Sequence, residues 1–327
     1  MATEQSASPH VAAVLAAAVL WGTTGTVASF APEGSSPLLV GLATFGFGGL
    51  LLFLRSPRDI LAFLRRPGTA WPWLLLGTVG IVVYPTTYYS SMSFIGVAAG
   101  NVVALGSGPL FAALLDRTLR RKPLTARWGI ATAVAIVGIA LLSFGVTPGG
   151  GGEAPTTGSI VAGVALGLLA GLGYAAYSVA ASAIMTTGVS SAASMGAMFF
   201  AGSVVMVPWF FLADAGPLAE PRGILILIYL AVVPMALAYL AFGYGLRMLS
   251  PATATTLTLL EPLVATSLAI VIVGERLQPV GWVGFALVGA GLVVIATAGV
   301  RKSTRQSTKG REALTGGERG DGARKRS

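Results

Sequence analysis

The sequence has 327 residues, of which 54% are hydrophobic and only 10% are Asp, Glu, Lys or Arg, and its mean hydropathy is +0.80. Soluble domains carry roughly a quarter charged residues, so this composition excludes a water-soluble globular protein, and a chain this apolar is not a disordered one either. Cysteine is absent and histidine occurs once, which excludes disulfides, cysteine nucleophiles and a zinc or iron site built from these residues. We therefore expect neither a metal ion nor another cofactor.

Ten segments are apolar enough and long enough to cross a bilayer. A membrane-spanning helix needs about 20 apolar residues, whereas a strand of a membrane barrel has about ten residues of alternating character. The sequence therefore predicts an all-α polytopic membrane protein with ten transmembrane helices. In chain order the predicted spans are 11–31, 37–54, 71–92, 95–115, 128–146, 160–185, 191–213, 224–246, 251–273 and 280–300.

The basic residues are distributed unevenly over the connections between these spans. If the N-terminus is cytoplasmic, all of the 21 Lys and Arg residues except Arg222 and Arg276 fall on the cytoplasmic side. Such a bias sets the orientation of membrane helices, so we expect both termini to be cytoplasmic in a multi-pass protein of the inner (cytoplasmic) membrane. The positive charge then reflects topology and attraction to anionic lipid, and nucleic acid is not an expected partner.

The chain divides into two similar halves. Gly108-Pro109-Leu110 in the fourth span and Glu261-Pro262-Leu263 in the ninth are 153 residues apart, and the same offset aligns the other spans and breaks without a gap. Each half has five spans, so the second half must enter the membrane from the opposite side. Inverted repeats of this kind are common in secondary transporters. The predicted regions are a cytoplasmic tail (1–10), a first five-helix repeat (11–146), a Gly-rich linker (147–159), a second five-helix repeat (160–300) and a disordered basic cytoplasmic tail (301–327).

Glu261 is the one acidic residue near the middle of a predicted span. A carboxylate at the centre of a bilayer costs on the order of 3 kcal/mol on insertion scales, and a carboxyl group in apolar surroundings takes up a proton more readily than one in water. Two interpretations follow: Glu261 is a proton-coupling or substrate-binding group, or it is a protonated structural residue.

Two prolines occupy matching positions in the two halves. Pro262 cannot donate to the carbonyl of Thr258, which leaves a free acceptor and a kink, and Pro109 has the same effect on Leu105. Paired interruptions in corresponding spans indicate a site near the midplane, so we predict functional helix breaks at Pro109 and Pro262. The alternative is a plain kink, which membrane helices tolerate.

Aromatic and polar residues inside the spans predict the lining of a cavity. Trp21 and Thr24 are three residues apart and so share a helix face, and Tyr174 and Tyr177 repeat this spacing in the second half. Such a lining suits a small amphipathic solute bound by stacking, hydroxyl groups or cation–π contacts; the alternative for each aromatic residue is packing alone. The predicted substrate-binding residues are Trp21, Thr24, Tyr84, Tyr88, Asn101, Tyr174, Tyr177, Tyr239 and Glu261.

The order of several motifs resembles a known family, the EamA-type branch of the drug/metabolite transporter superfamily, over about residues 11 to 300. The motifs are Leu20-Trp21-Gly22, Glu261-Pro262-Leu263 and Gly274-Glu275-Arg276-Leu277. The resemblance implies a bacterial inner-membrane carrier, often an exporter of amino acids or related metabolites, that works by alternating access around a central cavity. The first half departs from the pattern because Gly108 replaces the Glu before proline, which leaves Glu261 as the carboxyl at this paired position.

The predicted function is secondary active transport, with export of a small metabolite such as an amino acid and the proton as the expected coupling ion. A passive channel is a weaker alternative, because channels line their pores with rings of charges or carbonyls and Glu261 is isolated. An intramembrane lipid-modifying enzyme is weaker still, because it would need clustered catalytic side chains. We therefore expect a transporter and not an enzyme, with the solute, the bilayer and protons as its partners.

Overall fold

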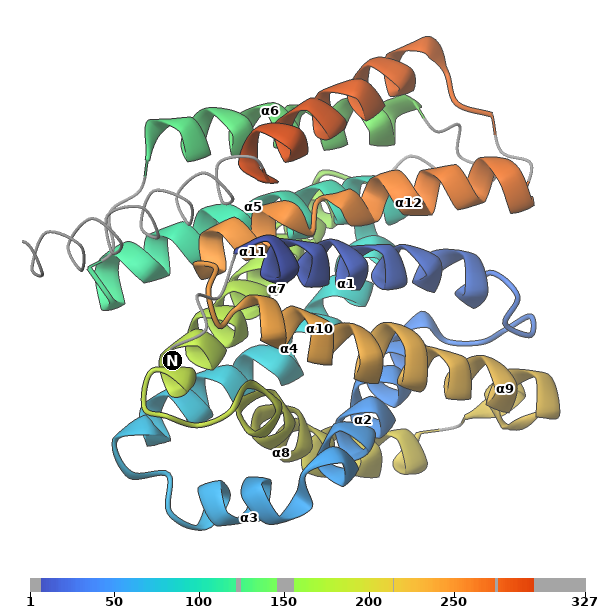
Figure 1. The fold of residues 1–327 in the computed structure, drawn as a ribbon. Coiled ribbons are helices and arrows are strands. Elements are labelled where there is room, and N and C mark those ends of the chain that lie inside the picture. Colours follow the sequence, from blue (N-terminus) through green and yellow to red (C-terminus); the bar gives the residue numbers. More distant parts are fainter. Residues whose placement is uncertain (1–6, 122–124, 146–155, 214, 274–275, 297–327) are drawn as a thin grey trace, which may run out of the picture.

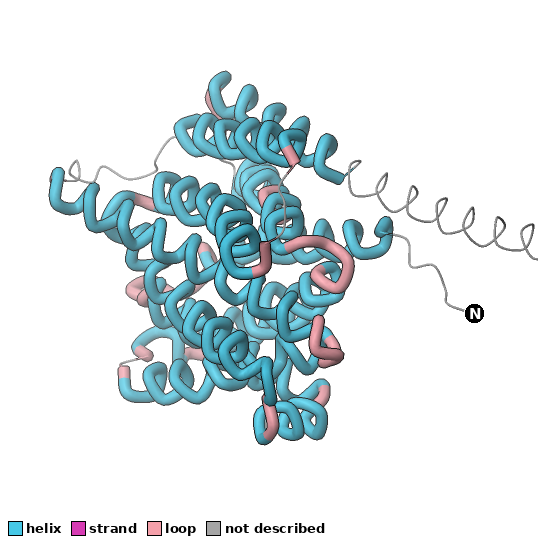
Figure 2. The backbone as a smooth tube through the Cα atoms, turned by 90° about the vertical axis from the view of Figure 1, so that its left-hand side faces the viewer, coloured by secondary structure: helices cyan, strands magenta, loops and turns pink. Residues whose placement is uncertain are grey.

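The chain forms a single bundle of helices (Figure 1). The computed structural model describes residues 7–121, 125–145, 156–213, 215–273 and 276–296. No strand is present among these residues, and most connections between the helices are short (Figure 2). The prediction of an all-α membrane protein is confirmed. Residues 1–6, most of the Gly-rich linker and the predicted tail 301–327 lie outside the described residues.

The long helices follow the predicted spans to within a few residues. The α-helices are α1 (Ala7–Ala28), α2 (Pro37–Arg55), α3 (Pro57–Arg65), α4 (Trp71–Ile95), α5 (Val97–Leu119), α6 (Ala126–Gly145), α7 (Thr157–Met185), α8 (Ser191–Leu212), α9 (Pro221–Leu230), α10 (Ala238–Gly245), α11 (Pro251–Leu257) and α12 (Leu260–Leu268). The shorter elements are two 3-10 turns, η1 (Gly68–Ala70) and η2 (Gly216–Ala219), and two π-helical segments, η3 (Ala231–Leu237) and η4 (Ala269–Val273). A last helix, Pro279–Ala296, closes the described chain.

Nine helices of the described residues are long and apolar enough to cross a membrane, with α9, η3 and α10 forming one of them and α11, α12 and η4 another. The predicted third span is α4, which has 25 residues and is not among these nine. Its second half carries the polar stretch 86–93, with the sequence Thr-Thr-Tyr-Tyr-Ser-Ser-Met-Ser. Several of these side chains face a cavity, as shown below.

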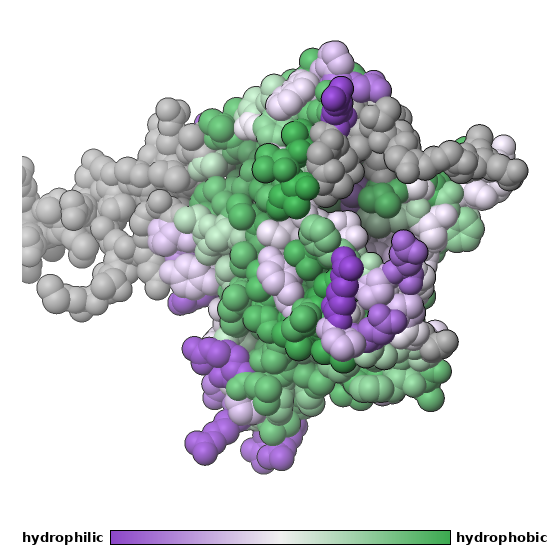
Figure 3. Space-filling view, turned by 90° about the vertical axis from the view of Figure 1, so that its right-hand side faces the viewer, coloured by the Kyte–Doolittle hydropathy of each residue, from purple (hydrophilic) through white to green (hydrophobic). Residues whose placement is uncertain are grey.

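The outer surface of the bundle is apolar. Phe211, Leu212 and Val271 are 71%, 89% and 80% exposed, and hydrophobic side chains (green) cover much of the face shown in Figure 3. An apolar surface of this extent needs a lipid environment. The exposed Trp71 and Trp282 lie at helix ends, where indole rings anchor a protein at the membrane interface. The chain is therefore an integral membrane protein.

A short helix, α3, connects the second and third spans. Ile60 and Phe63 are buried on one side of α3 and pack toward α8, whereas Arg58 and Arg65 are exposed. We predicted this segment only as a basic connection. The spacing of Ile60 and Phe63, three residues apart, was the available signal for an amphipathic helix.

The two halves make matching contacts along the fifth helix of each. A Cβ atom at Gly138 would lie 2.7 Å from the amide nitrogen of Val288, and one at Gly291 would lie 3.1 Å from Cβ of Ala135. Residues 153 apart are equivalent in the two halves, so Gly138 corresponds to Gly291 and Ala135 to Val288. The contact of Gly138 with Val288 is therefore equivalent to that of Gly291 with Ala135. The equivalence of the two contacts supports the predicted repeat. Both glycines allow the two helices to approach closely.

A second matched pair of contacts lies where the third helix of one half meets the first helix of the other. The hydroxyl of Ser91 donates to the carbonyl of Gly163 at 2.7 Å, and the rings of His10 and Tyr244 stack with centroids 4.5 Å apart. The same offset relates Ser91 to Tyr244 and His10 to Gly163. The chemistry of the two contacts differs, but their positions in the two halves agree.

Candidate functional site

A cavity of about 400 Å³ lies between the two halves. The structure brings all nine predicted substrate-binding residues to its wall. They come from α1 (Trp21, Thr24), α4 (Tyr84, Tyr88), α5 (Asn101), α7 (Tyr174, Tyr177), α10 (Tyr239) and α12 (Glu261). The volume is typical of a site for a small molecule.

The cavity reaches one end of the bundle. Ala28 at the end of α1, Pro37 at the start of α2 and Val97 at the start of α5 belong to its lining, and Val97 is 64% exposed. On the other side of the cavity wall, the rings of Phe199 and Phe242 are fully buried and pack against Tyr239 and Trp21. The cavity is therefore open toward the end where α1 terminates and closed toward the end where α1 begins.

Aromatic rings form most of the cavity wall. The ring of Trp21 lies 4.9 Å from that of Tyr239 and 6.4 Å, edge to face, from that of Tyr174. Tyr84 and Tyr88 are stacked, with centroids 5.4 Å apart. The contacts of Trp21 cross the boundary between the two halves, as does the 5.8 Å contact between the rings of Tyr84 and Tyr174, so the rings form one continuous surface.

Two tyrosine hydroxyl groups donate their protons to the wall itself. The hydroxyl of Thr258 donates to the carbonyl of Thr255 at 2.8 Å, so the 2.7 Å contact between Tyr174 and Thr258 must use the tyrosine proton. Tyr88 donates to Oδ1 of Asn101. The oxygen atoms of Tyr174 and Tyr88 therefore remain available as acceptors.

A third pair of hydroxyls, those of Tyr177 and Tyr239, forms a 2.8 Å hydrogen bond with each other. Both side chains are almost fully buried. This bond joins α7 to α10, and so it connects the first helix of the second half with the third helix of the same half.

Glu261 lies in the first turn of α12, just after a break in the helix. α11 ends at Leu257 and α12 begins at Leu260. The carbonyl of Thr258 accepts a hydrogen bond from the amide of Glu261 at 2.9 Å, so the free acceptor expected from Pro262 is not present. A 3-10-type bond satisfies it instead. The carboxyl group sits at the positive end of the α12 dipole, which favours a negative charge.

Pro109 and Pro234 have different surroundings from Pro262. α5 continues without interruption through Pro109, from Val97 to Leu119. Pro234 lies within the π-helical segment η3 and lines the cavity. π-helical turns are frequent at functional sites, and neither η3 nor η4 was predicted.

Glu261 is the one charged side chain among the described residues that line the cavity. An ion pair joins Asp116 and Arg120, outside this cavity. The carboxyl group of Glu261 therefore faces aromatic rings and small polar groups rather than a cation.

Two neutral polar groups of the wall have no hydrogen-bond partner among the described residues. They are Nε1 of Trp21 and Oγ1 of Thr44, in side chains that are 9% and 4% exposed. Thr44 was not predicted as a cavity residue, and four further lining residues were not predicted either. They are Phe45, Tyr89, Met92 and Met235. Phe and Met also occur on surfaces that face lipid, so sequence alone did not distinguish Phe45, Met92 and Met235, whereas Tyr89 carried the same signal as the predicted Tyr84 and Tyr88.

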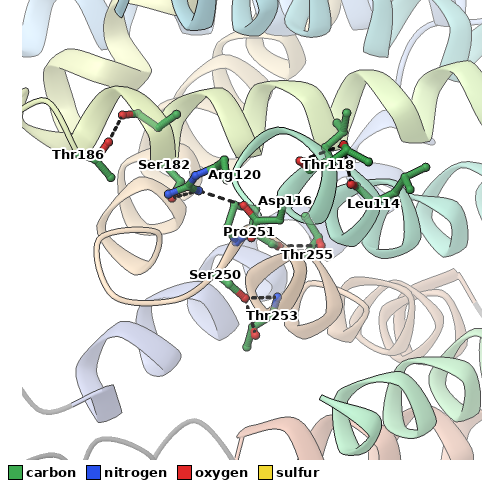
Figure 4. A network of polar contacts seen from close by, with 12 residues as sticks. Leu114, Asp116, Thr118, Arg120, Ser182, Thr186, Ser250, Pro251, Thr253 and Thr255 are labelled. Atoms are coloured by element: carbon green, nitrogen blue, oxygen red, sulfur yellow. Dashed lines mark hydrogen bonds and ion pairs between the residues drawn. The ribbon is translucent and has the colours of Figure 1, made fainter. Parts of the chain in front are cut away.

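A second cavity, of about 600 Å³, lies at the closed end, where α7 and α10 terminate. Its lining includes Arg120, Arg247 and several Ser and Thr side chains. The guanidinium group of Arg120 donates to Asp116 at 3.1 Å and to Ser182 at 2.8 Å, and so connects α5 to α7 (Figure 4).

The model of the EamA-like transporter family matches the chain twice, over residues 9–144 and 161–297. The chain belongs to this family. It is 33% identical over 296 residues to the uncharacterized transporter YwfM of Bacillus subtilis (strain 168), a match that covers 90% of this chain and 96% of that one.

Two further similarities agree with the family. A probable terminal-alkyne amino-acid exporter of Streptantibioticus cattleyicolor is 26% identical over 303 residues, covering 89% of this chain and 98% of that protein. A solved crystal structure superposes with a TM-score of 0.70 over 89% of this chain and 98% of its own, at 21% identity, and therefore shows the same fold. Family and relatives indicate a transporter rather than an enzyme.

Proposed function

We propose that the protein is a secondary active transporter that exports a small metabolite, such as an amino acid or a related amphipathic solute, in exchange for protons. The observation that carries this proposal is the single carboxyl group of Glu261 in an aromatic cavity that opens to one end of the bundle. A group that binds either a proton or a solute, in a site open to one side at a time, is the minimum requirement for coupled exchange.

The two ends of the bundle support alternating access. With the N-terminus in the cytoplasm, as the basic connections favour, the open end faces the outside and the Arg120 network lies at the closed cytoplasmic end. Two similar halves of opposite orientation provide two states of similar energy. Exchange of the open and closed ends would carry the contents of the cavity across the membrane.

Glu261 is the proposed coupling group, and the aromatic wall is the proposed solute site. In the outward-open state a proton enters and neutralises the carboxyl group of Glu261. A neutral carboxyl group costs less free energy inside the membrane than a charged one, so the change to the inward-open state becomes easier. In the inward-open state the proton leaves and the solute takes its place. Trp21, Tyr84, Tyr174 and Tyr239 would hold the solute from both halves.

The exporter direction and the inner-membrane location are proposed on two grounds. One relative carries the name of an amino-acid exporter, and another, YedA of Escherichia coli, that of an inner membrane transporter. A passive channel is less consistent with the structure, because buried rings at Phe199 and Phe242 close the cavity at one end.

Proton-coupled flux in proteoliposomes tests the proposal. A set of amines and amino acids is screened for solute-dependent proton movement by the purified wild-type protein, and the active solutes are then tested with Glu261→Gln. We expect this variant to keep solute exchange and to lose the response to a pH gradient. The carboxyl of Glu220, which is exposed at the start of α9, provides the matched control Glu220→Gln. Unchanged coupling in Glu261→Gln would contradict the proposal.

A further inference from the structure

We propose that the cavity selects solutes by charge: it binds small amines that carry one positive charge and no carboxylate, and it excludes anions. This inference rests on the proposed transport function and names the substrate class of the same cavity. It goes beyond that function because amino acids, whose carboxylate is negative, are predicted to bind less well than their esters, which carry only the positive ammonium group.

The first argument is the balance of charge in the wall. Glu261 is the one charged side chain of the described lining, and Lys, Arg and His are absent from that lining. The positive end of the α12 dipole amounts to about half an elementary charge, so the site remains negative when the carboxyl group is ionised. A carboxylate of the solute would be desolvated here without a cation to pair with, which is strongly unfavourable.

The second argument is the shape and chemistry of the rings. Eight aromatic side chains line the cavity, and they are Trp21, Phe45, Tyr84, Tyr88, Tyr89, Tyr174, Tyr177 and Tyr239. The face of an aromatic ring is negative, and it attracts an ammonium group most strongly when water is excluded. With both halves contributing rings around the carboxyl group of Glu261, a cation is stabilised from several directions.

The third argument is the use of hydroxyl protons. Tyr174 donates to Thr258 and Tyr88 donates to Asn101, so their oxygen atoms offer lone pairs rather than protons to the cavity. Lone pairs accept hydrogen bonds from an ammonium group and repel a carboxylate. These two hydroxyl groups of the wall therefore present acceptors to the cavity.

Two donors of the wall, both buried and without partners in the described chain, fit a neutral oxygen atom. The indole N–H of Trp21 and the hydroxyl of Thr44 lack partners among the described residues and belong to buried side chains. A buried donor gains most from an acceptor supplied by the ligand. An ester, amide or hydroxyl oxygen meets this need without bringing a negative charge into the site.

Four probes that share one phenyl ring test the inference. They are 2-phenylethylamine, L-phenylalanine methyl ester, L-phenylalanine and 3-phenylpropionate, which are two cations, a zwitterion and an anion. Their binding to the full-length protein in detergent is measured by titration calorimetry. We expect both cations to bind about tenfold more tightly than L-phenylalanine, because its carboxylate finds no cation in the cavity. 3-Phenylpropionate should bind weakest, because it also lacks the ammonium group that the rings attract.

Two variants connect this order to the site. Glu261→Gln is expected to weaken the binding of both cations by about tenfold, the size of one charge-assisted contact of about 1.4 kcal/mol, whereas Glu220→Gln leaves it unchanged. Circular dichroism confirms that each variant is folded. The inference is overturned if L-phenylalanine or 3-phenylpropionate binds as tightly as either cation, or if none of the probes binds.

The charge class of the solute and the proposed transport function can fail independently. If the zwitterion is preferred and is exchanged for protons, the charge class is wrong and the transport function stands. If the cations bind in the expected order but move no protons in proteoliposomes, the charge class stands and proton-coupled export is wrong.

Discussion

Gly108 and Glu261 occupy equivalent positions in the two halves, yet their surroundings differ completely. A Cβ atom at Gly108 would lie 2.9 Å from the ring of Tyr174, so this ring occupies the place of a side chain. At the equivalent place in the second half, Glu261 extends its carboxyl group into the cavity that Trp21 lines. The two halves share a fold, but an acidic side chain has room at this position only in the second half.

The backbone differs in the same way. α5 is continuous through Pro109, whereas α11 and α12 are separated just before Pro262. The break places the positive end of α12 beside Glu261 and satisfies the carbonyl of Thr258 within the turn. The two halves are therefore similar in fold, and at this position only the second half places a carboxyl group in the cavity.

Placing an acidic residue at the equivalent position of the first half should have the largest effect on folding. Gly108→Glu forces a side chain against Tyr174, and we expect overpacking of about 1–3 kcal/mol together with about 3 kcal/mol for a buried carboxylate. The folded yield should fall sharply, as measured by size-exclusion chromatography with fluorescence detection.

The double variant Gly108→Glu/Glu261→Gly sharpens this comparison, because it mirrors the natural arrangement. Glu261→Gly alone should remain folded and lose proton coupling, and the double variant should not regain it. A double variant that folds and couples like the wild type would show that the two halves are interchangeable.

Disrupting the polar network of Arg120 at the closed end should have the next largest effect on the free energy of unfolding. Arg120→Ala removes the cation that contacts Asp116 and Ser182, whose side chains are buried. Loss of one partner of a buried ion pair costs about 3–5 kcal/mol, and we expect the lower part of this range because Arg120 is partly accessible. Thermal unfolding in detergent measures the loss.

Arg247→Ala is the matched control, because Arg247 lines the same cavity but is exposed. We expect it to change the free energy of unfolding by less than about 0.5 kcal/mol. Equal effects of the two variants would mean that the network does not hold α5 and α7 together.

A smaller effect is expected at the hydrogen bond between Tyr174 and Thr258. Tyr174→Phe keeps the ring against Gly108 and removes the 2.7 Å bond to the break between α11 and α12. A net loss of about 1 kcal/mol in unfolding free energy should result, measurable by chemical denaturation. Tyr89→Phe, which removes a cavity-lining hydroxyl without a hydrogen bond to a described residue, should change stability less; the reverse order would contradict the assigned bond.

Sequence alone predicts the helices because the membrane sets their length. An apolar run of about 20 residues has few alternatives to a transmembrane helix, and the observed boundaries differ from the predicted ones by a few residues. The cavity residues that stood out were aromatic or polar groups within such runs, such as Tyr84 and Asn101. Each is costly or unusual in a helix that faces lipid.

Other features required the three-dimensional arrangement. Phe45 and Met235 line the cavity, yet their side chains suit lipid equally well. The π-helical segments η3 and η4 depend on tertiary packing rather than on a local motif. The satisfied carbonyl of Thr258 depends on the turn at 258–259, which the proline rule alone does not specify.

Distances across the two ends of the bundle test alternating access most directly. The chain has no Cys, so spin labels can be placed at Glu33→Cys and Ser93→Cys near the open end, or at Thr187→Cys and Met248→Cys near the closed end, and measured by pulsed electron paramagnetic resonance in liposomes. When Glu261 is replaced by Gln to mimic protonation, we predict that one distance shortens while the other lengthens. Two distances that change in the same direction, or that do not change, would contradict a carrier that opens its ends in turn.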